Sequence, residues 1–184
     1  MKSKIFILIF LLIFLVSCAY PPKKAPVYQM NFNSNNTSMK LYSSAFEQNK
    51  NLPDKYTCDG QGINPPLEIS GVPAGAKSLA LIVEDPDAVR GTFIHWLVWN
   101  IDPKTASITV GSIPTGAIQG TTSAGKTGYV APCPPSGTHR YIFKLYALDT
   151  MLDLTPNAGR DNLDQAMQGH TLDYAELIGL YQRK

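Results

Sequence analysis

The chain has 184 residues, 44% of them hydrophobic, which suits a single hydrophobic core. Its formal net charge of +2 comes from 16 Lys and Arg residues against 14 Asp and Glu residues. Because binding to DNA or RNA needs a strongly basic face, this balance argues against a nucleic-acid partner.

The N-terminus is typical of an export signal. Lys2 and Lys4 precede an uninterrupted apolar run over residues 5–16, which is too short to span a bilayer comfortably. The run closes in the sequence LVSC, which resembles the lipobox of bacterial lipoproteins. We therefore expect residues 1–17 to be a lipoprotein signal peptide and Cys18 to carry the lipid. A plain signal peptide or an uncleaved N-terminal anchor is the alternative.

A tether is predicted between the lipid and the folded domain. Residues 18–38 are rich in Pro, Lys, Asn and Ser and have no hydrophobic periodicity. No internal repeat or further boundary follows, so residues 39–184 are predicted to form one domain. This organisation places the protein at a membrane of the bacterial cell envelope, on its periplasmic face. Without Lys2 and Lys4, 14 basic residues face 14 acidic ones, so the exported protein is near neutral.

Two cysteines remain once Cys18 is assigned to the lipid. In an oxidising compartment Cys58 and Cys133 could form a disulfide. Cys133 also lies in a loop that is a candidate for the binding site, where a free thiol could line a pocket. The sequence does not supply the Cα separation that a disulfide requires, so both interpretations stay open.

Short apolar segments separated by Gly-rich and Pro-rich turns predict a mainly antiparallel β fold. A short strand is predicted within residues 39–46, and further strands are predicted at residues 67–69, 78–84, 93–101 and 141–148. Turns or loops are predicted for residues 52–67, 71–76, 111–129 and 155–160. The peptide bond before Pro65 or Pro66 is a candidate for the cis form.

The C-terminal part contains the only convincing helix in the pattern. Residues 161–168 predict a short amphipathic helix that ends at Gly169 in the C′ position. Its apolar face, at i, i+3 and i+4, is formed by Leu163, Ala166 and Met167. Residues 174–181 fit either a last strand or a helix by pattern, and Gly179 weakens the helix interpretation.

Two predicted strands carry the residues of interest. In residues 93–101, strict alternation puts one set on each face of the sheet. The two sets are His95, Leu97 and Trp99 on one face, and Ile94, Trp96, Val98 and Asn100 on the other. Residues 141–148 are almost entirely apolar, which predicts a strand buried on both faces near the middle of a sheet.

Polar residues gather where loops meet these two strands. The acidic turn Asp85-Pro86-Asp87 precedes the strand with His95, and a proline-rich loop leads into His139 at the other strand. We predict that the two junctions converge on one pocket. An Asp could orient His95 by accepting its Nδ1–H, while His139 and the backbone N–H groups of residues 136–138 could donate to an anion. The acidic pair could meet a positive group of the same ligand.

Each of these features also has a purely structural explanation. Asp-Pro-Asp is common in turns, because Asp caps the bend and Pro fixes it. His95 could be a hydrogen-bonded core histidine, and Arg140 could form an internal ion pair. A metal site built from the same carboxylates and histidines is weakly supported, because the chain has no CxxC and no ligand pair at helical spacing. We expect neither a metal nor a cofactor.

Two longer motifs occur at the junctions: DPDA at residues 85–88 followed by HWLVWNI at residues 95–101, and PPSGTHRY at residues 134–141. Both resemble signature motifs of the phosphatidylethanolamine-binding protein family, also called Raf kinase inhibitor-like. The flanking segments resemble the bacterial branch: YTCDG (56–60), NPPL (64–67), ELIG (176–179) and YQR (181–183). The likeness extends over residues 39–184.

The resemblance implies an antiparallel β-sandwich with a large central sheet, a smaller sheet and one or two short helices. It also implies an anion pocket for phosphate or phosphoethanolamine-like headgroups, and bacterial relatives suggest a homodimer. Carried over by position, the ligand-binding residues are Asp85, His95, Cys133, Pro134, His139 and Tyr141, with Asp87 nearby. The family usually has Pro where this chain has Val89, so the loop after Asp87 is expected to be less rigid.

The leading functional prediction is a membrane-anchored protein that binds a small anionic or zwitterionic ligand without turnover. One alternative is a hydrolase that uses Cys133 as nucleophile and His139 as base, although no nucleophile elbow is recognisable. Another is an inhibitor or scaffold for a protein partner, as the family name suggests. Inhibition of a kinase does not fit a protein outside the cytoplasm.

Overall fold

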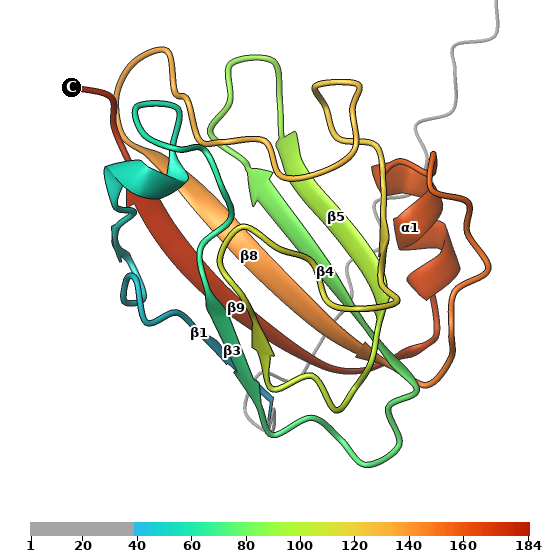
Figure 1. The fold of residues 1–184 in the computed structure, drawn as a ribbon. Coiled ribbons are helices and arrows are strands. Elements are labelled where there is room, and N and C mark those ends of the chain that lie inside the picture. Colours follow the sequence, from blue (N-terminus) through green and yellow to red (C-terminus); the bar gives the residue numbers. More distant parts are fainter. Residues whose placement is uncertain (1–38) are drawn as a thin grey trace, which may run out of the picture. The chain divides into compact units, whose positions relative to one another are not determined.

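The structure is a computed structural model that describes residues 39–184. The predicted signal peptide (1–17), the lipidated Cys18 and the tether (18–38) lie outside the described residues. Within the described part, the fold is mainly β, with two sheets, one short α-helix and one 3-10 turn (Figure 1). The predicted fold class, a large and a small antiparallel sheet with one or two short helices, is confirmed.

The large sheet contains six strands in the order β2–β9–β8–β4–β5–β7. Their bounds are β2 Lys50–Asn51, β9 Thr171–Tyr181, β8 His139–Leu148, β4 Ser78–Asp85, β5 Phe93–Ile101 and β7 Ile118–Gln119. The pairings are antiparallel except between β2 and β9, which run parallel. The small sheet has the order β1–β3–β6, with β1 Lys40–Tyr42, β3 Leu67–Ser70 and β6 Ser107–Ile108. The 3-10 turn, η2, spans Asp54–Tyr56.

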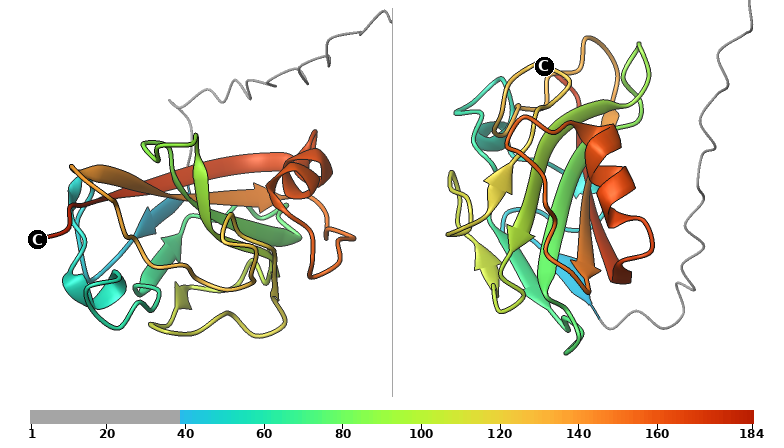
Figure 2. Two further views of the ribbon diagram at one scale, coloured as in Figure 1. Left: turned by 90° about the horizontal axis from the view of Figure 1, so that it is seen from above. Right: turned by 90° about the vertical axis from the view of Figure 1, so that its right-hand side faces the viewer.

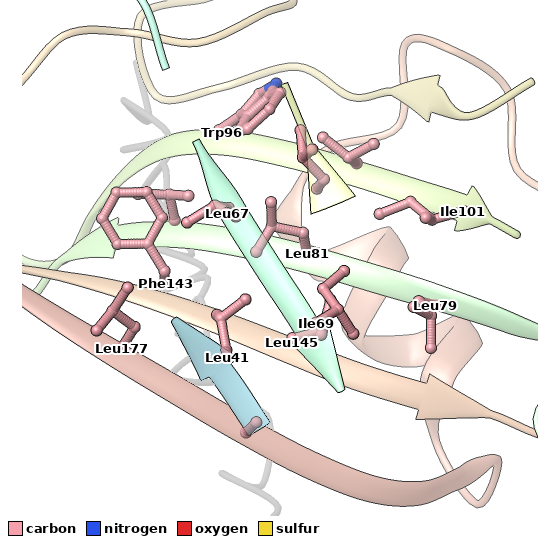
Figure 3. Packing of buried hydrophobic residues seen from close by; sticks show 14 of the residues in the cluster. Leu41, Leu67, Ile69, Leu79, Leu81, Trp96, Ile101, Phe143, Leu145 and Leu177 are labelled. Atoms are coloured by element: carbon pink, nitrogen blue, oxygen red, sulfur yellow. The ribbon is translucent and has the colours of Figure 1, made fainter. Parts of the chain in front are cut away.

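The two sheets pack face to face over one hydrophobic core (Figure 3). Alternation along β4 points Leu79, Leu81 and Val83 into this core. The small sheet contributes Leu41, Leu67, Ile69 and Ile108 from the opposite side. Burial of each such side chain stabilises the fold by about 1.5–3 kcal/mol, so the short strands of the small sheet are held mainly by what they cover.

Helix α1, Arg160–Met167, covers the other face of the large sheet (Figure 2). Leu163 and Met167 are buried there against Ala80 and Ile82 of β4 and other apolar residues, and Ala166 is partly buried. The predicted helix of residues 161–168 is therefore confirmed to within one residue. Gly169 has a φ of 79° directly after the C-cap residue Gln168, as predicted for a C′ glycine.

The structure decides or corrects several predictions about single elements. Residues 174–181, which fitted either a strand or a helix, are part of strand β9. The short strand predicted within residues 39–46 is β1, and the two-residue strands β2, β6 and β7 were not predicted. No cis peptide bond occurs in residues 39–184, so the proposed cis bond at Pro65 or Pro66 was wrong. In the same part of the chain, no helix is both long and apolar enough to cross a bilayer.

The strand that is buried on both faces is β4 and not β8. All eight residues of β4 are buried. In β8, Arg140 is exposed and Ile142 and Lys144 are half-buried, because α1 covers the outer face only toward the other end of the sheet. The position of β8 inside the large sheet was predicted, but its outer face is only partly covered.

A β-bulge interrupts the predicted alternation of β5. Val83 of β4 pairs with Trp96, whereas the next residue, Glu84, pairs with Ile94, so His95 is an extra residue in β5. Ile94 therefore joins the core under α1, on the face of Leu97 and Trp99, and His95 turns to the side of Tyr141 on β8. The predicted face assignment was wrong for these two residues, because a bulge re-aims the side chains that follow it.

A buried carboxylate joins α1 to the sheet. Glu84 accepts hydrogen bonds from Lys144 Nζ at 2.5 Å and from the guanidinium of Arg160 at the start of α1. Arg160 also bonds Asp164 one turn later. Burial by itself would raise the pKa of Glu84, but the hydrogen bonds and positive charges of Lys144 and Arg160 outweigh it and hold the pKa below 4.5.

We predict that Glu84→Gln lowers the free energy of unfolding at neutral pH by about 1–3 kcal/mol, because two charge-assisted hydrogen bonds are weakened. Urea unfolding measures this loss. Asp164→Asn is the control, since it weakens only a partly exposed pair on α1 and should cost about 0.5 kcal/mol. The pKa of Glu84 is depressed in the folded state, so its contribution is present above pH 4.5 and is lost as the pH falls through the folded-state pKa. Equal losses for both variants would contradict the proposed role of Glu84.

Candidate functional site

Two segments that are distant in sequence meet at one end of the large sheet. They are residues 86–92, between β4 and β5, and residues 130–138, before β8 (Figure 1). A pocket of about 330 Å³ lies between them. Its polar lining residues are Asp85, Arg90, His95 and His139, and its apolar wall includes Phe93, Val130, Pro134, Pro135 and Tyr141. The structure brings His95 and His139 to one pocket, as predicted.

His139 is fixed by a buried carboxylate. Its Nδ1 lies 2.7 Å from Oδ2 of Asp85, and both side chains are at least nine-tenths buried. Asp85 Oδ1 accepts a second hydrogen bond, at 2.8 Å, from the backbone N–H of Asp87. An ionised carboxylate only accepts, so Nδ1 carries the proton and Nε2 is the ring nitrogen left for a ligand.

His95 is held by backbone and not by an aspartate. Its Nδ1 lies 2.7 Å from the carbonyl oxygen of Val130, and the backbone N–H of Val130 donates back to the His95 carbonyl at 2.8 Å. A carbonyl only accepts, so this ring also has its proton on Nδ1. Burial lowers the pKa of His95 below 6.5, which leaves Nε2 of a neutral ring as an acceptor. The predicted Asp–His95 pair was wrong, because Asp85 bonds His139.

Tyr141 lines the same pocket as the two histidines. Its ring meets that of His95 edge-on, with centroids 5.2 Å apart. Burial is the main cause that raises the pKa of Tyr141 above 10, and its oxygen is hydrogen-bonded by the backbone of Cys133. The hydroxyl therefore stays protonated and neutral at physiological pH.

Asp87 does not line the pocket. Both of its carboxylate oxygens are bonded by Arg140: Oδ2 accepts from the backbone N–H at 3.0 Å and from Nε at 2.9 Å, and Oδ1 accepts from an Nη at 2.6 Å. These bonds lower the pKa of Asp87 to about 2. The internal ion pair considered for Arg140 is thus present, and it uses the carboxylate that was predicted to meet a ligand.

A disulfide joins Cys58 to Cys133 on the pocket wall. The backbone N–H of Cys58 also donates to the carbonyl of Pro132 at 3.0 Å. Loop 130–138 has no regular secondary structure before His139, so these links and the Val130–His95 pair hold it in place. Sequence analysis left open whether Cys133 forms a disulfide or is a free thiol, and in the structure it forms the disulfide.

Six of the seven predicted ligand-binding residues line the pocket: Asp85, His95, Cys133, Pro134, His139 and Tyr141. The backbone donors expected from residues 136–138 are not among the lining residues, since this segment is exposed and turns away at Gly137, which has a φ of 69°. Sequence reasoning missed Arg90, Phe93 and Val130. For Arg90 the available signal was its place in the loop between Asp85 and His95.

Among residues 39–184, no group of three His, Cys, Asp or Glu side chains suits a metal ion.

Loss of the disulfide should destabilise the domain and loosen the pocket wall. The two cysteines are 75 residues apart, and closing a loop of that length contributes about 2–5 kcal/mol to stability. We expect reduction, or Cys58→Ser with Cys133→Ser, to lower the unfolding free energy by that amount in guanidinium titrations. The double variant should not respond to reductant, which makes it the control. An unchanged midpoint on reduction would argue against the bond.

The pairing of Asp87 can be followed by its titration. In wild type, the carboxyl carbon of Asp87 should titrate near pH 2 in an NMR experiment, because Arg140 stabilises the charged form. Arg140→Gln should move the midpoint up toward 3.8. The folded-state pKa is depressed, so the pair stabilises the domain above pH 3.8 and loses this effect as the pH approaches 2. The same midpoint in both proteins would contradict the pairing.

The sequence matches the family model described as phosphatidylethanolamine-binding protein over residues 42–182. A UPF0098 protein of Methanothermobacter thermautotrophicus is 49% identical over 150 residues, which cover 79% of this chain and 99% of the relative. A UPF0098 protein of Pyrococcus horikoshii is 51% identical over 161 residues, covering 80% of this chain and 78% of the relative.

Two solved structures agree with this match. The crystal structure of a putative phosphatidylethanolamine-binding protein homolog from Chlamydia trachomatis superimposes with a TM-score of 0.78 at 44% identity, covering 81% of this chain and 100% of that one. YbcL of Escherichia coli, described as a new member of the mammalian family, gives 0.75 at 30% identity, covering 80% of this chain and 99% of that one. The chain belongs to the phosphatidylethanolamine-binding protein family.

Proposed function

We propose that this chain is a binding protein whose pocket holds the phosphoryl group of a small molecule or headgroup and does not turn it over. The observation that carries the proposal is the buried hydrogen bond between Asp85 and His139. It fixes an imidazole at the pocket wall with a defined proton position. In its protonated form the ring donates through Nε2 to an anion, while Asp85 balances the charge behind it.

The second histidine gives the pocket a complementary group. His95 has its proton on Nδ1, bonded to Val130, so its Nε2 accepts a hydrogen bond from an O–H or N–H of the ligand. The pocket thus offers one imidazole that can donate and one that accepts. A partly protonated phosphoryl group presents both kinds of partner, since it has charged oxygens and an O–H.

Binding without turnover is favoured by the state of Cys133. The alternative of a Cys/His hydrolase needs a free thiolate as nucleophile. Here the sulfur of Cys133 is bonded to Cys58, so the pocket lacks that nucleophile. Binding is then governed by charge-assisted hydrogen bonds at His139 and by contact with the apolar wall.

We also propose that the protein is attached to a membrane of the bacterial cell envelope through lipid at Cys18, with the domain on the periplasmic face. The lipobox-like sequence supports the anchor. The disulfide of the domain supports an oxidising compartment, because such bonds persist outside the cytoplasm. A homodimer or a protein partner for this domain stays a prediction.

The proposal predicts that His139→Ala weakens binding of inorganic phosphate and of phosphoethanolamine by about tenfold or more, since a hydrogen bond to a charged group is lost. Isothermal titration calorimetry measures both affinities. His170→Ala is the matched control. His170 is exposed, bonds Asp149, and lies at the opposite end of β8 and β9. Unchanged phosphate affinity in His139→Ala, with the fold intact by circular dichroism, would show that the pocket assignment is wrong.

A further inference from the structure

The carboxylates at the pocket are already paired within the fold. Asp85 bonds His139 Nδ1 and the backbone N–H of Asp87. Asp87 is bonded at both oxygens by Arg140 and does not line the pocket. A cationic group of a ligand, such as an ammonium, would have to compete with these partners. Within residues 39–184, the pocket therefore has no carboxylate that is free for a cation.

Arg90 is in the opposite situation. Among the residues that the structure describes, it is the only arginine or lysine that lines the pocket. Within residues 39–184 its guanidinium makes no hydrogen bond or ion pair, whereas Arg140 nearby is bound to Asp87. The unpaired permanent charge at the rim is thus positive, which favours an anionic group of a ligand.

The backbone around Arg90 holds it at the pocket rim. Gly91 donates its backbone N–H to the carbonyl of Ala88 at 3.1 Å, which closes a turn with Val89 and Arg90 at its two central positions. Gly91 has a φ of 95°, a conformation that other residues rarely adopt. The turn fixes where the Arg90 side chain starts, while its long stem keeps the guanidinium adaptable.

The pocket is too large for a phosphate ion alone. A phosphate has five non-hydrogen atoms, and even at the ~30 Å³ that one water molecule occupies in the liquid, these would fill about 150 Å³. The cavity measures about 330 Å³. The pocket therefore has room for atoms beyond a phosphoryl group, and its lining includes Phe93, Pro135 and Arg90.

We infer that the ligand is a small organic phosphate that carries a second anionic group, and that Arg90 recognises this second group. The inference rests on the proposed phosphoryl site at His139. It makes Arg90 a specificity-determining residue, and it assigns the ligand a second charge opposite to the ammonium of phosphoethanolamine. A carboxylate suits Arg90 well, because the planar guanidinium bonds it through two parallel N–H groups.

The test compares O-phosphoserine with O-phosphoethanolamine, which share a phosphate and an ammonium and differ by one carboxylate. Wild type should bind phosphoserine about five- to tenfold more tightly, the usual effect of one charge-assisted contact. The preference should shrink as salt rises from 0.02 to 0.5 M, because salt screens exposed charges. Calorimetry of the full chain gives each affinity.

Arg90→Gln should bind the two compounds within about twofold of each other, because the contact with the carboxylate is lost and only the shared phosphate and ammonium remain. The matched control is Lys77→Gln, which removes the same charge from an exposed residue just before β4, at the end of that strand remote from Asp85. It should retain the preference. Equal affinities in wild type, or a preference that survives in Arg90→Gln, would overturn the inference.

Failure of the phosphoryl site gives a different result. If wild type bound neither compound, or if His139→Ala bound both as well as wild type, the site at His139 would be wrong and the role of Arg90 with it.

A second arm of the experiment separates two possible sources of the same ligand chemistry, a lipid headgroup and a free metabolite. Retention on phosphatidylserine vesicles, lost in Arg90→Gln, assigns the group to a lipid headgroup, and a preference seen only with soluble compounds assigns it to a free metabolite.

Discussion

The hydrogen bond from His139 Nδ1 to Asp85 Oδ2 is the contact on which the site depends. It joins the last residue of β4 to the first residue of β8, two neighbouring strands that run antiparallel. A slip of one residue in their register would turn one of the two side chains to the other face of the sheet. The register is fixed by the core, since alternate residues of β4 pack under the small sheet and under α1. The polar pair is therefore positioned by apolar packing several residues away.

The second half of the pocket depends on two departures from regular structure. The bulge in β5 turns His95 toward Tyr141 instead of toward the core under α1. Loop 130–138 then meets His95 through the Val130 backbone, and the disulfide from Cys133 ties the same loop to Cys58. If β5 were regular and loop 130–138 were not tethered, His95 and the loop would not form the pocket wall that accompanies His139. Irregular backbone is common beside binding sites because it can aim a side chain that a regular ladder would bury.

The main strands and the helix were predictable because they follow from local pattern, whereas most of the pocket residues were predicted from the resemblance to the family. Apolar runs gave β4, β5 and β8 to within two residues at each end, and the i, i+3, i+4 pattern gave α1. The bulge at His95 leaves no such trace, since the largely apolar sequence of β5 fits a regular strand equally well. The partners of Asp85 and Asp87 depend on which loop reaches them in three dimensions, so the prediction that an aspartate bonds His95 was wrong. The two-residue strands β2, β6 and β7 carry too few residues to show any period.

The same limit explains why the charge of the pocket could not be read from residue types alone. Two aspartates in one turn suggest an acidic pocket wall when the groups that hydrogen-bond them are not known. Once His139 and Arg140 are seen to bond them, the wall contributes little free negative charge, and the arginine in the following turn decides the sign of the rim. The proposed phosphoryl site is at His139, on the wall of the pocket. Rim residues such as Arg90 lie outside the paired site and are free to contact the rest of a ligand. They therefore determine which phosphoryl compound the pocket prefers.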